Sequence, residues 1–330
     1  MINIQLFKFD SKTDYLPYYK SYSIKHDSID TLDDVLKSLY AIEKFGFIEN
    51  EDFFLLANNK YTSSKALLSD ILNDSNELIL EPLSIKRAIN DLIIDTKDYQ
   101  AKLDLLDKYM SADEKETIIK NKSYMLEYYA SNTLHFNDDY IGEHVILLGL
   151  DIAKKDDSLQ NDIFSILNSE DGLINKSSLQ YRILNYPEKK ESKKNEPYDI
   201  IQSFENFNIA VYDALNPISF EYVVEQSNAI YVNLKSKHFD IPFDAKKLSY
   251  LMAGTILLEA LDNNADFLIV NTGEDLSLFD AKQKQIEKTM GREINLPVLT
   301  RGQFIKLLSG EKDKNTLGLN NHKVKLPFLD

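Results

Sequence analysis

The stretch that decides the fold is ELILEPLSIKRAINDLIIDTKDY, at residues 77–99. Its first part has the pattern of a short strand, and Pro82 predicts where that strand ends because proline cannot donate a ladder hydrogen bond. A second apolar run follows, and a helical periodicity takes over from Asp98 onward. The stretch therefore predicts a junction between a domain that contains strands and a domain made of helices.

The composition limits which functions the chain can have. At 330 residues it can form two or three domains, and an apolar content of 43% is that of a globular protein. Lys and Arg total 38 against 53 Asp and Glu, and the net charge of −15 argues against a basic surface that tracks phosphates and so against nucleic-acid binding. The absence of cysteine excludes disulfides, thiolate nucleophiles and thiolate-bound zinc or iron–sulfur clusters.

The remaining general signals point to a cytoplasmic protein without a cofactor. No window approaches the roughly eighteen apolar residues of a membrane span, and the first ten residues have a strand pattern rather than that of a signal peptide. The five histidines are scattered, and no phosphate-binding glycine motif or nucleophile elbow occurs. We therefore expect no bound metal and no catalytic residues, and we keep an enzymatic activity only as the alternative.

The first 95 residues predict a hairpin followed by a helix. Alternating apolar residues begin at Ile2, and a second strand is expected near residues 22–26. Thr31 has the pattern of a helix cap, with acids in the first turn where they oppose the helix dipole. The apolar face expected for this helix consists of Leu32, Val35, Leu36, Leu39 and Ile42.

The quoted junction and the segment FKFDSKTDYLPYYKSYSI, at residues 7–24, resemble the iron–sulfur subunit of succinate dehydrogenase and fumarate reductase. The resemblance implies a β-grasp, ferredoxin-like domain at residues 1–97. The four residues at the positions of its 2Fe–2S ligands would be Phe45, Asn50, Phe53 and either Ser64 or Lys65. None is a thiolate, so Phe45 and Phe53 are expected to fill the former cluster space as core residues.

The same resemblance continues through an all-helical domain at residues 98–204. Segments NKSYMLEYYASN, at residues 121–132, and ILNSEDGLINKSS, at residues 166–178, are similar to passages around the further clusters of that family. The implied ligand positions are Asn121, Tyr124, Glu127, Ser131, Lys176, Arg182 and Tyr186. One hypothesis is that Lys176 and Arg182 neutralise acids that a cluster once balanced; solvated surface charges are the alternative.

A charged linker at residues 188–197 precedes a third domain, at residues 205–330. Strands and helices alternate there, which predicts an α/β fold with a parallel sheet. The closing text from ALDNNADFLIVNTGEDLSLF onward is similar to the cysteine-rich CCG domain of heterodisulfide reductase and its relatives. The resemblance places a former ligand pair at Thr272 and Asp275.

Thr272 and Asp275 have two interpretations. Carboxylates at a strand end, with Asp280 downstream and His238 nearby, could form a site for a hard cation. Acids that follow a strand more often cap the next helix, and Asp275 fits that role.

Taken together, the sequence predicts an α+β multidomain protein with β-grasp, helical ferredoxin-like and CCG-type α/β domains. We expect a non-catalytic structural or regulatory protein that binds another protein, with a redox-enzyme subunit as one candidate partner. Tyr15, Tyr18, Tyr19 and Tyr22 could anchor such a partner, or they could pack half-buried onto the next domain. The alternative function is a small-ligand binder or enzyme that reuses an emptied cluster cavity near Thr272 and Asp275.

Overall fold

The computed structural model describes residues 1–25, 29–49, 51–72, 76–122, 124–186, 198, 200–214 and 220–327. The chain divides into two compact units. Unit 1 contains residues 1–149 and 175–188, and unit 2 contains residues 150–174 and 189–330. The three predicted domains stay a prediction, and the predicted linker at residues 188–197 lies outside the described residues.

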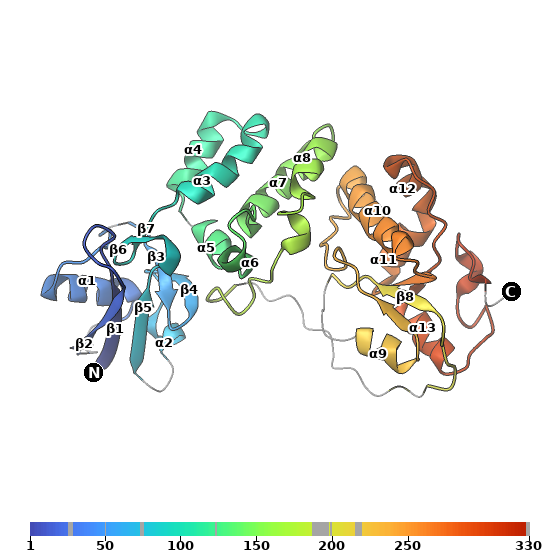
Figure 1. The fold of residues 1–330 in the computed structure, drawn as a ribbon, viewed down its shortest axis with the longest axis horizontal. Helices are drawn as coiled ribbons and strands as arrows, with labels where there is room; N and C mark the ends of the chain where they lie inside the picture. The colour runs from blue at the N-terminus through green and yellow to red at the C-terminus, as the bar shows by residue number, and fades with distance from the viewer. Residues whose placement is uncertain are drawn as a thin grey trace. The chain divides into compact units, whose positions relative to one another are not determined.

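Unit 1 begins with a five-stranded sheet in the order β2-β1-β5-β3-β4. Strand β1 is antiparallel to β2 and parallel to β5, so the first and last strands of this sheet meet at its centre (Figure 1). The strands are β1 (Ile2–Lys8), β2 (Tyr18–Ile24), β3 (Phe54–Ala57), β4 (Lys60–Ser63) and β5 (Glu77–Glu81). Strand β2 starts earlier than the sequence predicted, because it pairs with β1 along the whole length from Ile2 to Lys8.

Helix α1 (Leu32–Ile42) starts at the predicted cap. The Asp34 backbone N–H donates to Thr31 Oγ1 at 3.3 Å, and the Asp34 carboxylate accepts from the Thr31 backbone N–H at 2.9 Å. Four of the five predicted apolar positions are buried in the core of the sheet. The prediction was wrong for Ile42, which is 61% exposed because the helix ends there.

The quoted stretch forms a junction within unit 1. Strand β5 ends at Glu81, directly before Pro82, as predicted. The second apolar run forms a small antiparallel pair, β6 (Ala88–Asn90) and β7 (Ile93–Ile94), rather than leading directly into a helix. Helices then follow: α3 (Lys97–Leu103), α4 (Ala112–Lys120), α5 (Tyr124–Tyr129), α6 (Thr133–Phe136) and α7 (Glu143–Lys155). A short helix α2 (Leu68–Ile71) precedes the junction.

Unit 2 contains a four-stranded parallel sheet in the order β11-β10-β8-β9. Helices α10 and α12 lie on one side of this sheet, and α9 and α13 lie on the other (Figure 1). Its elements are α8 (Gln160–Leu167), β8 (Asn208–Val211), α9 (Phe220–Gln226), β9 (Ile230–Val232), α10 (Lys246–Asp262), β10 (Phe267–Val270), α11 (Gly273–Leu276), α12 (Gln283–Met290), β11 (Val298–Thr300) and α13 (Arg301–Leu308). The predicted parallel α/β arrangement is confirmed.

The fold class is thus mixed, with several sheets and helices in both units. Within the described part of the chain, no helix is both long enough and apolar enough to cross a membrane.

Candidate functional site

Aromatic side chains fill the region that the resemblance aligns with the 2Fe–2S ligand positions. Phe45 and Phe53 are buried in the core of unit 1, as predicted, and Phe47 lies between them with ring centroids 5.9 and 5.1 Å away. Ser64, the implied fourth position, is also buried, and its backbone N–H donates to the Phe53 carbonyl at 2.7 Å. Asn50 lies outside the described residues. Side chains therefore pack closely in this region, as they do in an ordinary protein interior.

A buried ion pair lies beside these rings. Lys8 Nζ donates to Asp91 Oδ2 at 2.9 Å and lies 5.8 Å from the centroid of the Phe45 ring. The backbone N–H groups of Gly46 and Phe9 also donate to the Asp91 carboxylate, at 2.8 and 3.0 Å. The buried charges of Lys8 and Asp91 therefore pair with each other. Burying a charge without such a partner would be costly.

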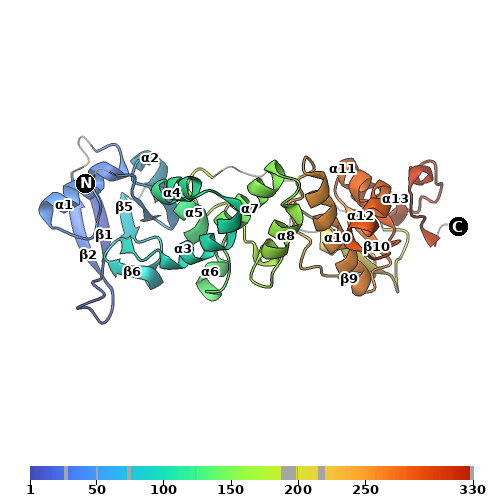
Figure 2. The ribbon, with the colours of Figure 1, turned by 90° about the horizontal axis from the view of Figure 1, so that it is seen from above.

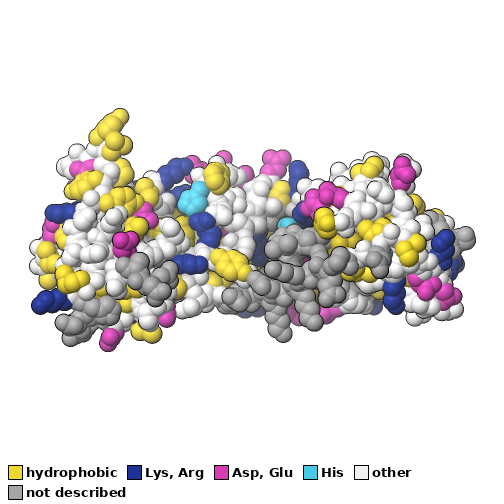
Figure 3. Space-filling model, turned by 90° about the horizontal axis from the view of Figure 1, so that it is seen from below, with side chains coloured by type: hydrophobic (Ala, Val, Ile, Leu, Met, Phe, Trp, Pro, Cys, Tyr) yellow, Lys and Arg dark blue, Asp and Glu magenta, His cyan; other side chains and the backbone are white. Residues whose placement is uncertain are grey.

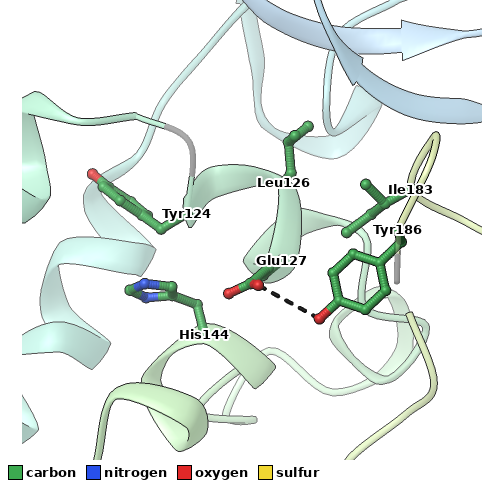
Figure 4. Close-up of a pocket in the computed structure, with 6 residues that line it drawn as sticks. All are labelled: Tyr124, Leu126, Glu127, His144, Ile183 and Tyr186. Atoms are coloured by element: carbon green, nitrogen blue, oxygen red, sulfur yellow. Dashed lines mark hydrogen bonds between the residues drawn. The ribbon is translucent and has the colours of Figure 1, made fainter. Parts of the chain in front are cut away.

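The helical part of unit 1 contains a cavity of about 300 Å³ (Figure 4). Its walls come from α5, from the first turn of α7 and from the segment that ends at residue 186. The lining residues are Tyr124, Leu126, Glu127, His144, Ile183 and Tyr186. Tyr124, Glu127 and Tyr186 are three of the ligand positions implied by the sequence, so the structure brings them together around one cavity.

Glu127 and Tyr186 face each other across this cavity. The Tyr186 hydroxyl donates to Glu127 Oε1 at 3.5 Å, although the two residues are 59 positions apart in sequence (Figure 4). Burial, together with the charge of Glu127, raises the pKa of Tyr186 to about 12. The phenol therefore stays protonated at neutral pH and keeps its role as a donor.

His144 forms the neutral side of the cavity. Its Nδ1 lies 3.1 Å from the Tyr99 hydroxyl, and its ring centroid lies 4.9 Å from that of Tyr124. The Tyr124 ring also stacks on the Tyr99 ring at 4.4 Å. Burial lowers the pKa of His144 to about 4, so the imidazole carries no charge at neutral pH. No spacing pattern singles out this histidine in the sequence.

A second carboxylate, Glu143, is fully buried next to His144 in the chain. Its Oε1 accepts from the Ser177 backbone N–H at 2.8 Å and from Ser177 Oγ at 2.7 Å. Ser131, another implied ligand position, is buried with its Oγ 3.3 Å from Ser177 Oγ. Among the described residues, no ion pair involves Glu143. One oxygen of this buried carboxyl group therefore has two hydrogen-bond donors, both from Ser177.

The other implied positions of the helical region do not reach the cavity. Asn121 caps the C-terminus of α4 through its backbone N–H, and Lys176 is half-buried. Arg182 stacks over the Tyr61 ring, donates to Asn132, and lies 3.2 Å from His135 Nε2. Within the described part of the chain, Arg182 contacts aromatic, amide and imidazole groups, and the hypothesis that it neutralises an acid stays a prediction.

In unit 2, Thr272 and Asp275 form a capping box at the start of α11. The Asp275 carboxylate accepts from the Thr272 backbone N–H at 2.9 Å and from Thr272 Oγ1 at 2.8 Å. Asp280 accepts instead from the backbone N–H groups of Lys323 and Val324. No group of three potential metal-ligating side chains occurs among the described residues. The capping interpretation of Asp275 is therefore confirmed.

An exposed aromatic hairpin tip projects from unit 1. Tyr15 is 95% exposed, and Leu16, Tyr18 and Tyr19 are exposed as well. Figure 2 shows the loop of the β1–β2 hairpin extending beyond the sheet, and Figure 3 shows hydrophobic side chains gathered on this projection. Tyr22 packs against the core of unit 1, and the Tyr19 ring lies edge-on to the core residue Phe7, with the ring centroids 5.9 Å apart. Of the two alternatives for these tyrosines, the exposure of Tyr15, Tyr18 and Tyr19 favours the one in which they are accessible to a partner.

The two edges of the five-stranded sheet differ. Edge strand β4 is covered by the chain itself, because the Tyr61 backbone N–H donates to the Arg182 carbonyl at 2.8 Å and the Leu184 backbone N–H donates to the Tyr61 carbonyl at 2.9 Å. Edge strand β2 pairs with β1 on one side, and no described segment pairs with its other side. An exposed edge of this kind is a template for pairing with another chain.

Comparisons with known proteins identify part of unit 2. Residues 241–323 match the HdrB-like C-terminal domain. They form a CCG-type domain that, in this chain, contains no cysteine. The resemblance to that domain predicted from the sequence is confirmed over these residues. No curated protein matches the chain.

Two solved structures are similar to larger parts of the chain. One is the crystal structure of a hypothetical protein from Helicobacter pylori, with 15% identity and a TM-score of 0.45, covering 99% of this chain and 98% of that one. The other is the Mycobacterium smegmatis Sdh1 complex in the apo form, with 12% identity and a TM-score of 0.35, covering 56% of this chain and 92% of that one. Both similarities are weak.

Proposed function

We propose that the protein is a non-catalytic, protein-binding relative of an iron–sulfur electron-transfer subunit, with no cluster and no redox activity. The absence of cysteine supports this, because iron–sulfur clusters are held by thiolates. The filled region around Phe45 and Phe53 supports it as well. In this proposal, the sheet of unit 1 is a β-grasp ferredoxin-like domain and helices α3 to α7 belong to a helical ferredoxin-like domain, each without ligands.

The observation that carries the proposal is the open edge of β2 next to the exposed hairpin tip. A partner strand that adds to β2 would gain main-chain hydrogen bonds, and Tyr15, Leu16 and Tyr18 would supply apolar contact area beside it. The proposed partner is a protein with an accessible strand and an apolar surface next to it. A redox-enzyme subunit is the first candidate, in line with the resemblance of the sequence.

Affinity purification of the tagged full chain from its own organism, grown with and without respiratory electron acceptors, tests this proposal. The wild-type protein is compared with the double variant Tyr15→Ser, Leu16→Ser and with the control Tyr222→Ser, an exposed tyrosine on α9 of unit 2. We expect wild type and control to retain one chain in a stoichiometric ratio and the double variant to lose it. Equal recovery by all three proteins, or recovery of the isolated chain alone, would contradict the proposal.

The double variant is suited to this test because it leaves the fold intact. Both side chains are exposed, and exposed positions change the free energy of unfolding by roughly 0.5 kcal/mol or less. We therefore expect the double variant to have the same circular dichroism spectrum and the same melting temperature as the wild-type protein.

The alternative proposal is a small-ligand binder that reuses an emptied cavity. At Thr272 and Asp275 the carboxylate is engaged in its capping box, which disfavours that location. The cavity at Tyr124, Glu127 and Tyr186 has the open volume that such a function needs.

A further inference from the structure

We propose that residues 182–184 form a clasp over the outer edge of strand β4, and that protonation of His135 releases this clasp. The released edge of β4 is then available for pairing with another chain, as exposed strand edges are. The clasp depends on contacts within unit 1 alone and is independent of the partner binding proposed for β2.

The backbone of the clasp makes few contacts with β4. The Tyr61 backbone N–H donates to the Arg182 carbonyl at 2.8 Å, and the Leu184 backbone N–H donates to the Tyr61 carbonyl at 2.9 Å. These two bonds form a single isolated bridge between Tyr61 and Ile183. Ile183 is buried, and Leu184 packs against the core of the sheet. The side-chain contacts of Arg182 therefore contribute much of what holds the clasp in place.

Arg182 connects the clasp to helix α6. Its guanidinium group lies 5.4 Å from the centroid of the Tyr61 ring, donates to Asn132 Oδ1, and has Nη2 3.2 Å from His135 Nε2. Because a guanidinium group has no acceptor, His135 Nε2 must accept this hydrogen bond. The imidazole is therefore neutral in the closed clasp and carries its proton on Nδ1. A second proton, on Nε2, would replace the hydrogen bond by a contact between two cations.

The groups that face His135 do not compensate such a charge. Partial burial, followed by the charges of Arg182 and Arg87, holds the pKa of His135 below its ordinary value of 6.5. The hydroxyl of Tyr61 lies 3.5 Å from His135 Nε2, and burial raises the pKa of this phenol, so it stays neutral. Asp138, which follows α6, forms its ion pair with Lys86, at 2.5 Å.

The direction of the pH effect follows from these contacts. In the released clasp, His135 is away from Arg182 and regains its ordinary pKa, so the released form binds a proton more readily than the closed form. The population of the released form therefore rises as the pH falls below 6.5. At neutral pH the hydrogen bond from Arg182 and the burial of Ile183 keep the clasp closed.

A single introduced thiol tests the release, because the chain has no cysteine of its own. In Ile183→Cys the thiol lies at a buried position and reacts with a maleimide only when the clasp opens. Labelling rates at pH 7.5 and pH 5.5 are compared with and without His135→Gln, which keeps an acceptor but cannot titrate. The pH dependence of the thiol itself is common to both proteins. The ratio of the rate with His135 to the rate with His135→Gln should rise roughly 2- to 10-fold between these two pH values.

The control Val35→Cys places a thiol in the buried face of α1, which unfolding of unit 1 exposes. Its ratio should stay constant. An unchanged ratio for Ile183→Cys, or an equal rise for both thiols, would overturn the proposal.

NMR titration of the five histidines gives the same answer without an introduced thiol, with His135→Gln identifying the signal of His135. We expect the pKa of His135 to lie below 6.5 in the wild-type protein and to rise in Arg182→Gln. A wild-type value of 6.5 or above, or a value that Arg182→Gln leaves unchanged, would also overturn the proposal.

Discussion

The burial of His144 predicts a specific pH dependence of stability. The imidazole contacts Tyr99 and Tyr124, and it lies in the first turn of α7, where the helix dipole also opposes a positive charge. An unfolded histidine binds a proton below its ordinary pKa of 6.5, whereas burial holds the pKa of His144 in the folded state at about 4. The unfolded state therefore binds more protons between these values, and the free energy of unfolding must fall as the pH falls through this window.

The size of this effect follows from the pKa difference. A shift from 6.5 to about 4 corresponds to a total of roughly 3 kcal/mol, which is lost completely only below pH 4. Between pH 7.5 and pH 5.5 the same linkage removes about 1.3 kcal/mol. This narrower range is preferable for experiments, because the net negative charge of the chain declines at lower pH and a net charge near zero promotes association.

Urea unfolding at pH 5.5, 6.5 and 7.5, followed by tyrosine fluorescence, measures the effect. Wild type is compared with His144→Gln. All other titrating groups contribute equally to both proteins, so the variant should lose only the part of the pH dependence of the free energy of unfolding that comes from His144. The difference in slope should persist in 0.5 M salt, because it comes from burial rather than from attraction between exposed charges. If wild type and His144→Gln lose the same free energy between pH 7.5 and pH 5.5, the assigned environment of His144 is wrong.

Three further substitutions test the described packing by urea unfolding. Lys8→Met should lower the free energy of unfolding by about 3–5 kcal/mol, because it leaves the buried Asp91 carboxylate without its cation. Adding Asp91→Asn should restore part of this loss. A loss below about 1 kcal/mol for Lys8→Met would contradict the buried pair. Phe45→Ala should cost about 3–5 kcal/mol by opening a cavity in the filled region, and a neutral result would mean that this region is not close-packed. Thr272→Ala should cost about 1 kcal/mol through loss of the capping box with Asp275, and a larger loss that depends on added divalent cations would revive the cation site.

Local patterns predicted individual elements well. Strand β1 begins at Ile2 and strand β5 ends at Glu81, directly before Pro82, both as the sequence predicted. The predicted cap at Thr31 was also correct, because a capping box depends on residues three positions apart. Signals of this kind lie within one element and can be found without knowing the tertiary structure.

Features that depend on distant segments could not be predicted in the same way. The Lys8–Asp91 pair joins residues 83 positions apart, and neither residue stands out from the exposed charges around it. The contact between Tyr186 and Glu127 and the inclusion of His144 likewise depend on how helices and loops meet. The resemblance did place Tyr124, Glu127 and Tyr186 in related regions, but it could not show that their side chains surround an open volume. The sequence also did not predict the exposure of Tyr15, because an aromatic residue near a hairpin is equally compatible with a core position and with an interface.

The central claim is that β2 receives a strand from a partner protein. Hydrogen–deuterium exchange of the free chain and of the complex recovered by affinity purification tests it most directly. The account predicts that backbone amides of β2, at Tyr18–Ile24, exchange markedly more slowly in the complex than in the free chain. Unchanged exchange in β2, with protection at another surface of the chain, would contradict it.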